Sequence, residues 1–145
     1  MTQRTTPPSP KRVLIIKPSA LGDVVTALPV LRGLKRTFPD CSVSWMVNDN
    51  CADIISHDSD IDEIIIFQRK KMGAAWRSLS AARLVIRFLW KLRKSRFDWV
   101  IDLQGLLRSG IFARASGAPL RAGFASAREG AAWFYNHRYS PKAPH

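Results

Sequence analysis

The chain has 145 residues, 46% of them hydrophobic, and a formal net charge of +12. Its length suits one domain with a sizeable core, and no apolar run approaches the roughly 18 residues of a membrane span. The two cysteines have no ligand-spaced histidines, which excludes a zinc site and a disulfide framework. We therefore expect no metal, no other cofactor and a cytoplasmic protein.

Alternating apolar patterns predict an α/β fold, a Rossmann-like parallel sheet with helices on both faces. Residues 1–10 are polar and proline-rich and predict a disordered tail without a signal peptide, so we expect one domain over residues 11–140. The predicted strands are Val13–Ile16, Ser42–Val47, Glu63–Phe67, Trp99–Leu103 and Leu120–Phe124. The predicted helices are one from Leu21 to Phe38, then Cys51–Ser56, Trp76–Arg96, Gly105–Ser116 and Gly130–Tyr135.

The helix predicted over Trp76–Arg96 is amphipathic. We assign its buried stripe to Trp76, Leu79, Leu84, Ile86, Phe88, Leu89 and Leu92. Large aromatic side chains favour the interior. We accordingly expect the tryptophans at 76, 90, 99 and 133 to be core residues rather than stacking platforms.

The loop after the first strand is a candidate functional site, because ligands of open α/β sheets bind outside the carboxyl ends of the strands. It holds one glycine, Gly22, so it matches neither the dinucleotide nor the Walker fingerprint. It offers Lys17, Ser19, backbone N–H groups and the carboxylate of Asp23. A carboxylate at a helix start is a common cap, so Asp23 is either a cap or a functional acid.

Charge is distributed unevenly along the chain. Seven of the eleven acids lie between Asp40 and Glu63 without a Lys or Arg, and ten Lys/Arg lie between Arg69 and Arg96 without an acid. Such a field suits an anionic partner, although a solvated helix face would account for part of it. Arg69, Lys70 and Lys71 follow a strand end directly, which favours a ligand-binding role for these three.

A second polar cluster follows the fourth strand. Asp102, Gln104, Arg108 and Ser109 lie beside the next helix start, a natural anion site, and Arg108 with Ser109 suits a phosphate or a carboxylate. Asp102 has an alternative role as a buried partner of the loop backbone or of Arg108.

Three blocks of the sequence carry a family resemblance. The first reads Lys-Pro-Ser-Ala-Leu-Gly-Asp-Val-Val from Lys17 and is followed by Ala-Leu-Pro-Val-Leu; the second is Phe97–Ser109; the third is Arg128–Asn136. In this order they resemble the ADP-heptose:lipopolysaccharide heptosyltransferases of glycosyltransferase family 9. The resemblance implies the N-terminal, acceptor-side half of a GT-B glycosyltransferase, with residues 141–145 starting the continuation towards a nucleotide-sugar domain.

The resemblance also implies an activity: inverting transfer of heptose from ADP-heptose to the lipopolysaccharide inner core, with Asp23 as the catalytic base. This chain would bind the anionic glycolipid acceptor, ADP-heptose would bind through the missing domain, and the fragment alone would be inactive. A peripheral position at the inner membrane stays open. The acceptor-binding candidates are Lys17, Ser19, Gly22, Arg69, Lys70, Lys71, Asp102, Gln104, Arg108 and Ser109.

Two other classes of protein stay open as alternatives. A basic nucleic-acid-binding module would account for the charge, but the sequence has no recognised motif and few aromatics within the basic run; we expect no nucleic acid partner. A nucleotide-binding module without catalysis would account for the fold, but the glycines are missing. Steeply salt-dependent binding of random DNA would favour the first, and tight binding of ADP by this chain alone would favour the second.

Overall fold

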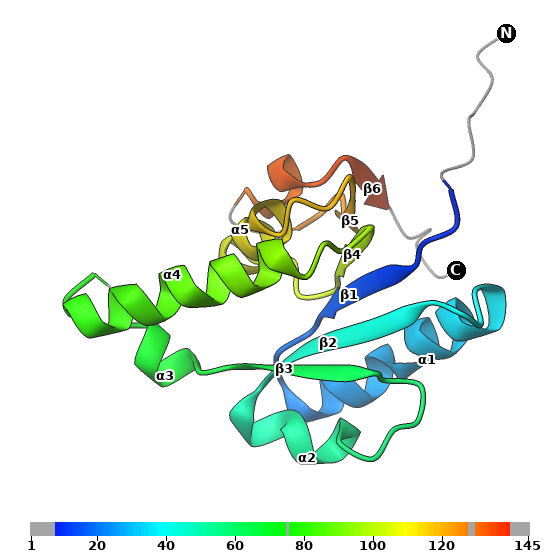
Figure 1. The fold of residues 1–145 in the computed structure, drawn as a ribbon, viewed down its shortest axis with the longest axis horizontal. Helices are drawn as coiled ribbons and strands as arrows, with labels where there is room; N and C mark the ends of the chain where they lie inside the picture. Colours follow the sequence, from blue (N-terminus) through cyan, green and yellow to red (C-terminus); the bar gives the residue numbers. More distant parts are fainter. Residues whose placement is uncertain (1–7, 75, 128–129, 140–145) are drawn as a thin grey trace, which may run out of the picture.

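A computed structural model of the protein describes residues 8–74, 76–127 and 130–139. In these residues six parallel strands form one sheet in the order β3-β2-β1-β4-β5-β6 (Figure 1). The strands are β1 (Arg12–Ile16), β2 (Ser42–Asn48), β3 (Glu63–Phe67), β4 (Trp99–Asp102), β5 (Leu120–Phe124) and β6 (His137–Tyr139). The predicted parallel α/β fold is confirmed, and the strand predicted at Val13–Ile16 pairs on both sides, with β2 and β4.

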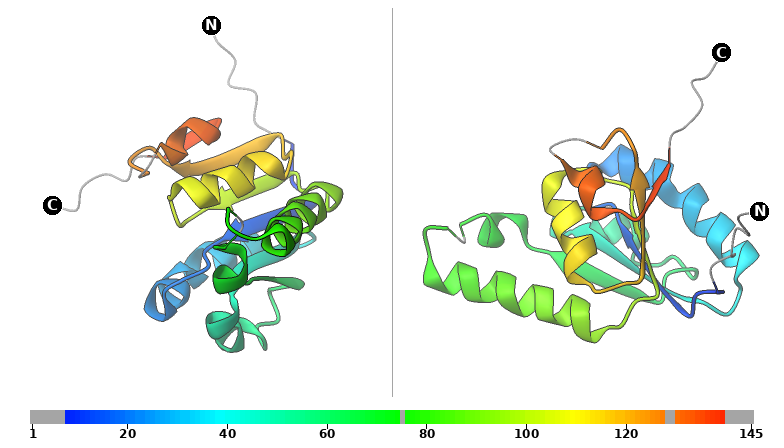
Figure 2. Two further views of the ribbon diagram at one scale, coloured as in Figure 1. Left: turned by 90° about the vertical axis from the view of Figure 1, so that its left-hand side faces the viewer. Right: turned by 90° about the horizontal axis from the view of Figure 1, so that it is seen from above.

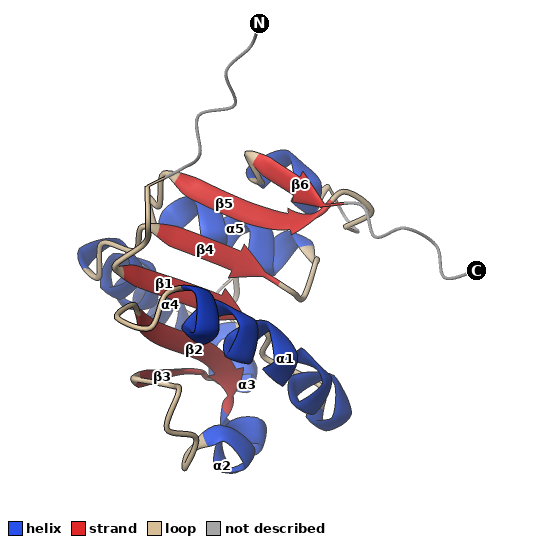
Figure 3. Cartoon of the chain, turned by 90° about the vertical axis from the view of Figure 1, so that its right-hand side faces the viewer, coloured by secondary structure: helices blue, strands red, loops and turns tan. Residues whose placement is uncertain are grey.

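Helices cover both faces of this sheet (Figures 2 and 3). They are α1 (Leu21–Thr37), α2 (Ala52–Ile55), α3 (Arg69–Met72), α4 (Leu79–Lys94) and α5 (Leu107–Ala115), with 3-10 turns η1 (Asp49–Cys51) and η2 (Ala131–Phe134). Residues of α1 and α2 pack on one face, and residues of α4, α5 and η2 pack on the other.

The central strand β1 explains why its sequence is continuously apolar. Side chains of a strand alternate between the faces, so Val13 and Ile15 pack in the cluster that contains Leu31 of α1. Leu14 and Ile16 pack in the cluster that contains Leu92 of α4. Both faces are covered and all four side chains are fully buried, which leaves no position on β1 for a polar residue.

The basic segment differs from the prediction. The helix expected over Trp76–Arg96 is shorter, because Ser78 caps α4 and its Oγ accepts a hydrogen bond from the Ala81 N–H at 3.4 Å. Arg69, Lys70 and Lys71 directly follow the third strand, as the sequence shows, but they form one short turn of helix, α3, which was not predicted.

The prediction of buried tryptophans is wrong for three of the four. Trp76, Trp90 and Trp133 are exposed, and Trp99 is half-buried. Trp45 of β2, which was not among them, is fully buried. The expected stripe of α4 is also wrong in part. Ala81, Phe88 and Leu92 are its buried residues, whereas Leu79 and Ile86 lie in solvent.

The ends of the domain add one element. Strand β6 was not predicted, because its three residues are all exposed at the sheet edge and carry no apolar run. Residues 1–7, 128–129 and 140–145 lie outside the described residues, and with them most of the predicted tail, part of the third sequence block and the expected continuation. Pro10, the last residue of the predicted tail, is buried.

Candidate functional site

The loops that follow β1, β2 and β4 are tied together at the carboxyl edge of the sheet. The Asn48 N–H donates to the Pro18 carbonyl at 2.9 Å, and the Leu103 N–H donates to the Ile16 carbonyl at 3.0 Å. Lys17, predicted to bind the acceptor, donates from Nζ to the Leu103 carbonyl at 3.3 Å. Its ammonium therefore links two loops and is only half-buried.

Asp23 lies in the first turn of α1 and is exposed. The cap position of α1 is Ala20, which has no side-chain oxygen, and among the described residues the Asp23 carboxylate makes no recorded hydrogen bond or ion pair. This geometry does not support the capping alternative. Leu21 and Val25, its neighbours on α1, are exposed apolar side chains. The edge of the sheet beside Asp23 is therefore open, and a catalytic role for Asp23 stays a prediction.

A small cavity of about 80 Å³ opens at this edge. Five of the ten predicted acceptor-binding residues line it: Ser19, Arg69, Gln104, Arg108 and Ser109. They come from the loop after β1, from α3, and from the loop and helix after β4. The prediction that these separate stretches meet at one edge is consistent with this placement, although their role in binding stays a prediction.

Asn48, the last residue of β2, also lines the cavity and was missed. The Asn48-Asp49-Asn50 run was interpreted only as the end of a strand, but a polar residue at the carboxyl end of a parallel strand is itself a signal. Asn48 is 5% exposed. Among the described residues, its Oδ1 and the Oε1 of Gln104 are buried without a hydrogen-bond partner. Buried polar atoms are rarely left unpaired, and both residues line the cavity, so their oxygens are candidates for hydrogen bonds from a bound ligand.

A second, wider hollow of about 410 Å³ shares Asn48 and Arg69 with this cavity and is lined further by Asp49, Asn50 and Lys70. The two hollows form one polar, cationic surface, which we call the edge site. Of the other predicted residues, Lys71 and Gly22 are exposed and line neither hollow.

Arg108 is held in place by an aromatic ring. Its guanidinium carbon lies 5.5 Å from the ring centroid of Phe67, at the end of β3. A cation over a ring face is attracted by the ring quadrupole. This contact orients the exposed guanidinium towards the part of the edge between β3 and α5, where the cavity lies.

Asp102 supports the site from beneath. Its carboxylate is fully buried, and Oδ1 accepts from the Gln104 N–H at 2.9 Å and the Gly105 N–H at 3.2 Å. Oδ2 accepts a short hydrogen bond from the Tyr135 hydroxyl. Burial raises the pKa of Asp102 above its usual range, against the hydrogen bonds from Tyr135 and the loop N–H groups. Asp102 is fully buried and therefore fits its alternative role, as a partner of the loop backbone, while a direct role in acceptor binding stays a prediction.

Two glycine positions make this support possible. Gly105 ends the loop that Asp102 holds and has φ +69°, a conformation that favours glycine. A Cβ on Gly123 of β5 would overlap the ring of Tyr135, so glycine there lets the ring cross the strand towards Asp102. Ser109 lies next to the same group, but its Oγ donates to the Leu106 carbonyl at 2.8 Å and accepts from the Leu106 N–H at 3.0 Å. Its hydroxyl is thus engaged in the start of α5.

Three acidic residues that precede the basic run form ion pairs with α1 and not with the cations of the edge site. Asp58 and Asp60 bind Arg32 of α1 at 2.6 and 2.5 Å, and Asp62 binds Lys35 at 3.0 Å. The Arg32 hydrogen bond lowers the pKa of Asp58. These three acids are therefore paired with cations of α1. Among the described cations of residues 69–96, one ion pair is recorded, between Lys91 and Glu63 at 3.8 Å. The edge site, with Arg69, Lys70 and Arg108 against the single carboxylate of Asp49, therefore keeps a net positive charge.

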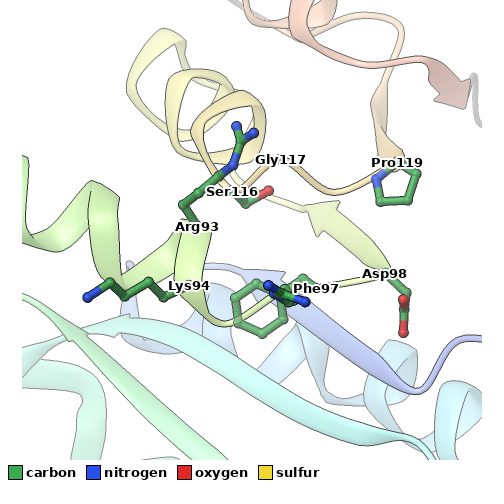
Figure 4. Close-up of a pocket in the computed structure, with 8 residues that line it drawn as sticks. Arg93, Lys94, Phe97, Asp98, Ser116, Gly117 and Pro119 are labelled. Atoms are coloured by element: carbon green, nitrogen blue, oxygen red, sulfur yellow. The ribbon is translucent and has the colours of Figure 1, made fainter.

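A different hollow, of about 650 Å³, lies at the opposite edge of the sheet, where β4 and β5 begin (Figure 4). Arg93 extends there from α4 towards Ser116 and Gly117 at the end of α5. The one acid that lines it, Asp98, accepts from the backbone N–H groups of Lys11 and Arg12 at 2.8 and 2.9 Å. That carboxylate holds the start of β1 and is not free for chemistry.

No group of three His, Cys, Asp or Glu residues that could hold a metal ion occurs within the part of the chain that the structure describes. No helix in residues 8–74, 76–127 or 130–139 is long and apolar enough to cross a membrane. An open parallel sheet with a cavity outside the ends of its central strands defines a Rossmann-like α/β domain, and this is the place where such sheets bind ligands.

Comparison with known proteins narrows this class. The sequence pattern of glycosyltransferase family 9 (heptosyltransferase) matches residues 85–145. The chain is 31% identical over 131 residues to lipopolysaccharide heptosyltransferase 1 of Salmonella typhimurium, covering 88% of this chain and 41% of the relative. It is 35% identical over 132 residues to lipopolysaccharide heptosyltransferase 1 of Pseudomonas aeruginosa, covering 88% and 37%.

A solved structure agrees in fold. The E. coli heptosyltransferase WaaC with ADP-2-deoxy-2-fluoro heptose superposes with a TM-score of 0.80 at 30% identity, covering 92% of this chain and 44% of that one. The chain belongs to glycosyltransferase family 9. It spans about two fifths of the length of the curated relatives it matches, as expected for the N-terminal half of a GT-B enzyme.

Proposed function

We propose that this chain is the acceptor-binding half of an inverting glycosyltransferase that moves heptose from ADP-heptose to the lipopolysaccharide inner core in the cytoplasm. The observation that carries the proposal is the edge site, where Arg69, Arg108, Asn48 and Gln104 converge on one cavity beside the loop that leads to Asp23. The printed names of its relatives supply the reaction: heptosyl transfer to lipopolysaccharide, and an ADP-sugar analogue bound to one of them.

The chemistry of the edge site favours an acidic saccharide as acceptor. Guanidinium groups bind phosphate and carboxylate oxygens through charge-assisted hydrogen bonds, and Arg69 and Arg108 both line the cavity. The unpaired oxygens of Asn48 and Gln104 accept hydrogen bonds, which the hydroxyl groups of a sugar donate.

Asp23 would act as the general base. The acceptor hydroxyl oxygen attacks the anomeric carbon of the donor, and the bond from that carbon to the ADP oxygen breaks, with its electron pair leaving on the diphosphate. Asp23 takes the hydroxyl proton as the new bond forms, and a single displacement inverts the anomeric configuration. Groups that stabilise the leaving diphosphate would come from the part of the relatives that this chain does not span, so the chain alone should not turn over.

The test of Asp23 uses a chimera in which this chain replaces the matching N-terminal part of the E. coli relative. Asp23→Asn should lower turnover about 100- to 10,000-fold, the usual worth of a positioned base, with acceptor and donor affinity changed far less. The melting temperature should hold, because Asp23 is exposed and its carboxylate makes no recorded hydrogen bond or ion pair with the described residues. Asp53→Asn is the matched control, an exposed aspartate in the first turn of α2. An Asp23→Asn chimera with full activity would refute the catalytic role.

The predicted role of Arg69, Lys70 and Lys71 in acceptor binding can be tested on this chain by calorimetry with a delipidated, phosphorylated inner-core oligosaccharide. Replacing Arg69, Lys70 and Lys71 with Ala should weaken binding and flatten its salt dependence. Lys71 lines neither hollow, so its single substitution should cost least. Lys11→Ala with Arg36→Ala removes two exposed cations from elsewhere as the control. Unchanged affinity in the triple variant would show that these three cations only face solvent and do not bind the acceptor.

A further inference from the structure

Helix α4 has a second apolar face that points away from the sheet. Leu79, Ile86 and Trp90 are 75%, 54% and 60% exposed. They are spaced by seven and then four residues, which places them on one line of a helix with 3.6 residues per turn. Phe88, which points into the core, lies on the opposite side of the helix. The three side chains therefore share one side of the helix, with Arg83 on the same side between Leu79 and Ile86.

Cations flank this stripe. They are Arg83, Arg87, Lys91, Arg93 and Lys94, all exposed. Only Lys91 has an ion-pair partner recorded among the described residues, Glu63 at 3.8 Å. We call the apolar line and these cations together the outer face of α4. Its composition, an apolar strip with a basic border, is typical of helices that lie in a membrane interface.

Trp90 stands between two open hollows of different character. On one side an apolar hollow of about 510 Å³ is lined by Ile86, Leu89, Trp90, Arg93 and Ala115. On the other side a basic hollow of about 740 Å³ is lined by Arg12, Arg87, Trp90, Lys91, Lys94 and Ser95. One hollow suits an acyl chain and the other suits the phosphate of a lipid headgroup, and Trp90 lines both.

The outer face is also placed where a flat surface can reach it. Figures 1 and 2 show the amino end of α4 projecting beyond the sheet, together with α3. Trp76 precedes α4 at this projecting end and is exposed, with the Arg77 guanidinium 4.6 Å from its ring centroid. An indole with a cation at a protruding tip continues the chemistry of the stripe beyond the helix.

We infer that the outer face of α4 docks on an anionic phospholipid bilayer, with the helix lying in the plane of the interface. Leu79, Ile86 and Trp90 enter the boundary between headgroups and acyl chains, and the flanking cations bind lipid phosphates. Charge selects this occupant. A second copy of the chain would present the same cations and be repelled. Nucleic acid would pair with the cations but would leave the exposed Leu79 and Ile86 without an apolar partner.

The experiment is flotation of the chain with vesicles of phosphatidylcholine alone or with one third phosphatidylglycerol. It needs neither donor nor acceptor, so its outcome is independent of the proposed transfer reaction. Binding should require the anionic lipid. Because any strongly basic protein is attracted to anionic vesicles, the decisive variant removes apolar residues only. Ile86→Ser with Trp90→Ser should lower the partition coefficient about tenfold or more, whereas Trp133→Ser, which removes an exposed tryptophan on η2, should leave it unchanged.

Two further measurements complete the test. Arg83→Gln with Arg87→Gln should lower partitioning about fivefold per cation, more than the control Lys11→Gln with Arg36→Gln. Lipids brominated near the top of the acyl chain should quench the fluorescence of the wild type more than that of Trp90→Phe. The inference is overturned if no vesicle binds, if the Ile86/Trp90 variant binds as tightly as the wild type, or if Trp90 is not quenched. It is equally overturned if the outer face mediates dimers or binds duplex DNA in place of vesicles.

Discussion

Tyr135→Phe tests the buried support of the edge site by removing a single oxygen. The Tyr135 hydroxyl donates to Oδ2 of Asp102, a carboxylate with 0% exposure. In the variant that oxygen loses its donor, and because the site is fully buried water does not replace it without disturbing the packing. The ring stays, so no large cavity forms.

The magnitude depends on the charge of Asp102. A hydrogen bond to a charged group contributes about 1.5–3 kcal/mol and one between neutral groups about 0.5–1.5 kcal/mol. Burial raises the folded-state pKa of Asp102 above its ordinary value of 3.8. The ionised form is therefore the one that burial penalises, and stability from this group is lost as pH rises through the folded pKa. Tyr135→Phe raises that pKa further, so its cost should be small in acid, grow as pH passes the wild-type folded pKa, and be largest above it.

The assay is urea unfolding over a pH series that runs from the lowest pH at which the protein stays folded up to pH 8, followed by tryptophan fluorescence, to which the buried Trp45 contributes. At the upper pH we expect a loss of about 1.5–3 kcal/mol and a melting temperature lower by about 3–10 °C. Tyr139→Phe is the control, since it alters the other tyrosine, exposed on β6. In an Asp102→Asn background the cost of Tyr135→Phe should shrink and become independent of pH. Equal losses for the two tyrosine variants, or a loss that does not change with pH, would refute the reasoning.

Two further predictions use the same unfolding measurements. Gly123→Ala should lower the free energy of unfolding, because its Cβ would overlap the Tyr135 ring and overpacking costs about 1–3 kcal/mol. Gly33→Ala, in open space inside α1, should raise the free energy of unfolding by about 0.5–1 kcal/mol. Cys41 and Cys51 are buried, and burial raises the pKa of Cys41, so a disulfide reagent should modify both only as fast as the fold opens; rapid modification in the absence of urea would contradict their burial.

The strands were predictable because their physics is local. A strand covered on both faces is apolar at every position, and Val13–Ile16 was predicted on this ground. Glu63–Phe67 was predicted from its run of three isoleucines, although it is an edge strand and Ile66 is exposed. The edge strand β6 is exposed along its whole length, so it leaves no such signal. Asn48 was missed for a related reason: its burial depends on the loop that carries Pro18, thirty residues earlier in the chain.

The orientation of α4 was not predictable from the sequence. Its apolar residues occupy two opposite sides of the helix, one with Phe88 and Leu92 and the other with Ile86 and Trp90. A stripe drawn through all of them mixes the core side with the solvent side. The sheet decides between them, since Phe88 meets the rings of Phe67 and Phe112 at 5.9 and 5.2 Å. Tryptophan side chains are usually largely buried. The exposed Trp76, Trp90 and Trp133 therefore depart from this expectation.

The edge site and the outer face of α4 are joined by one short connection, because α3 carries Arg69 and Lys70 and α4 begins only a few residues later. If both proposals hold, a glycolipid acceptor binds with its saccharide at α3 while its acyl chains remain in the layer that holds α4. The chain should then bind a vesicle-embedded acceptor more tightly than the delipidated oligosaccharide. Ile86→Ser with Trp90→Ser should abolish that difference and leave oligosaccharide affinity unchanged, whereas Arg69→Ala should weaken both. A membrane advantage that survives the α4 variant would separate the two surfaces and assign the lipid contact to another part of the molecule.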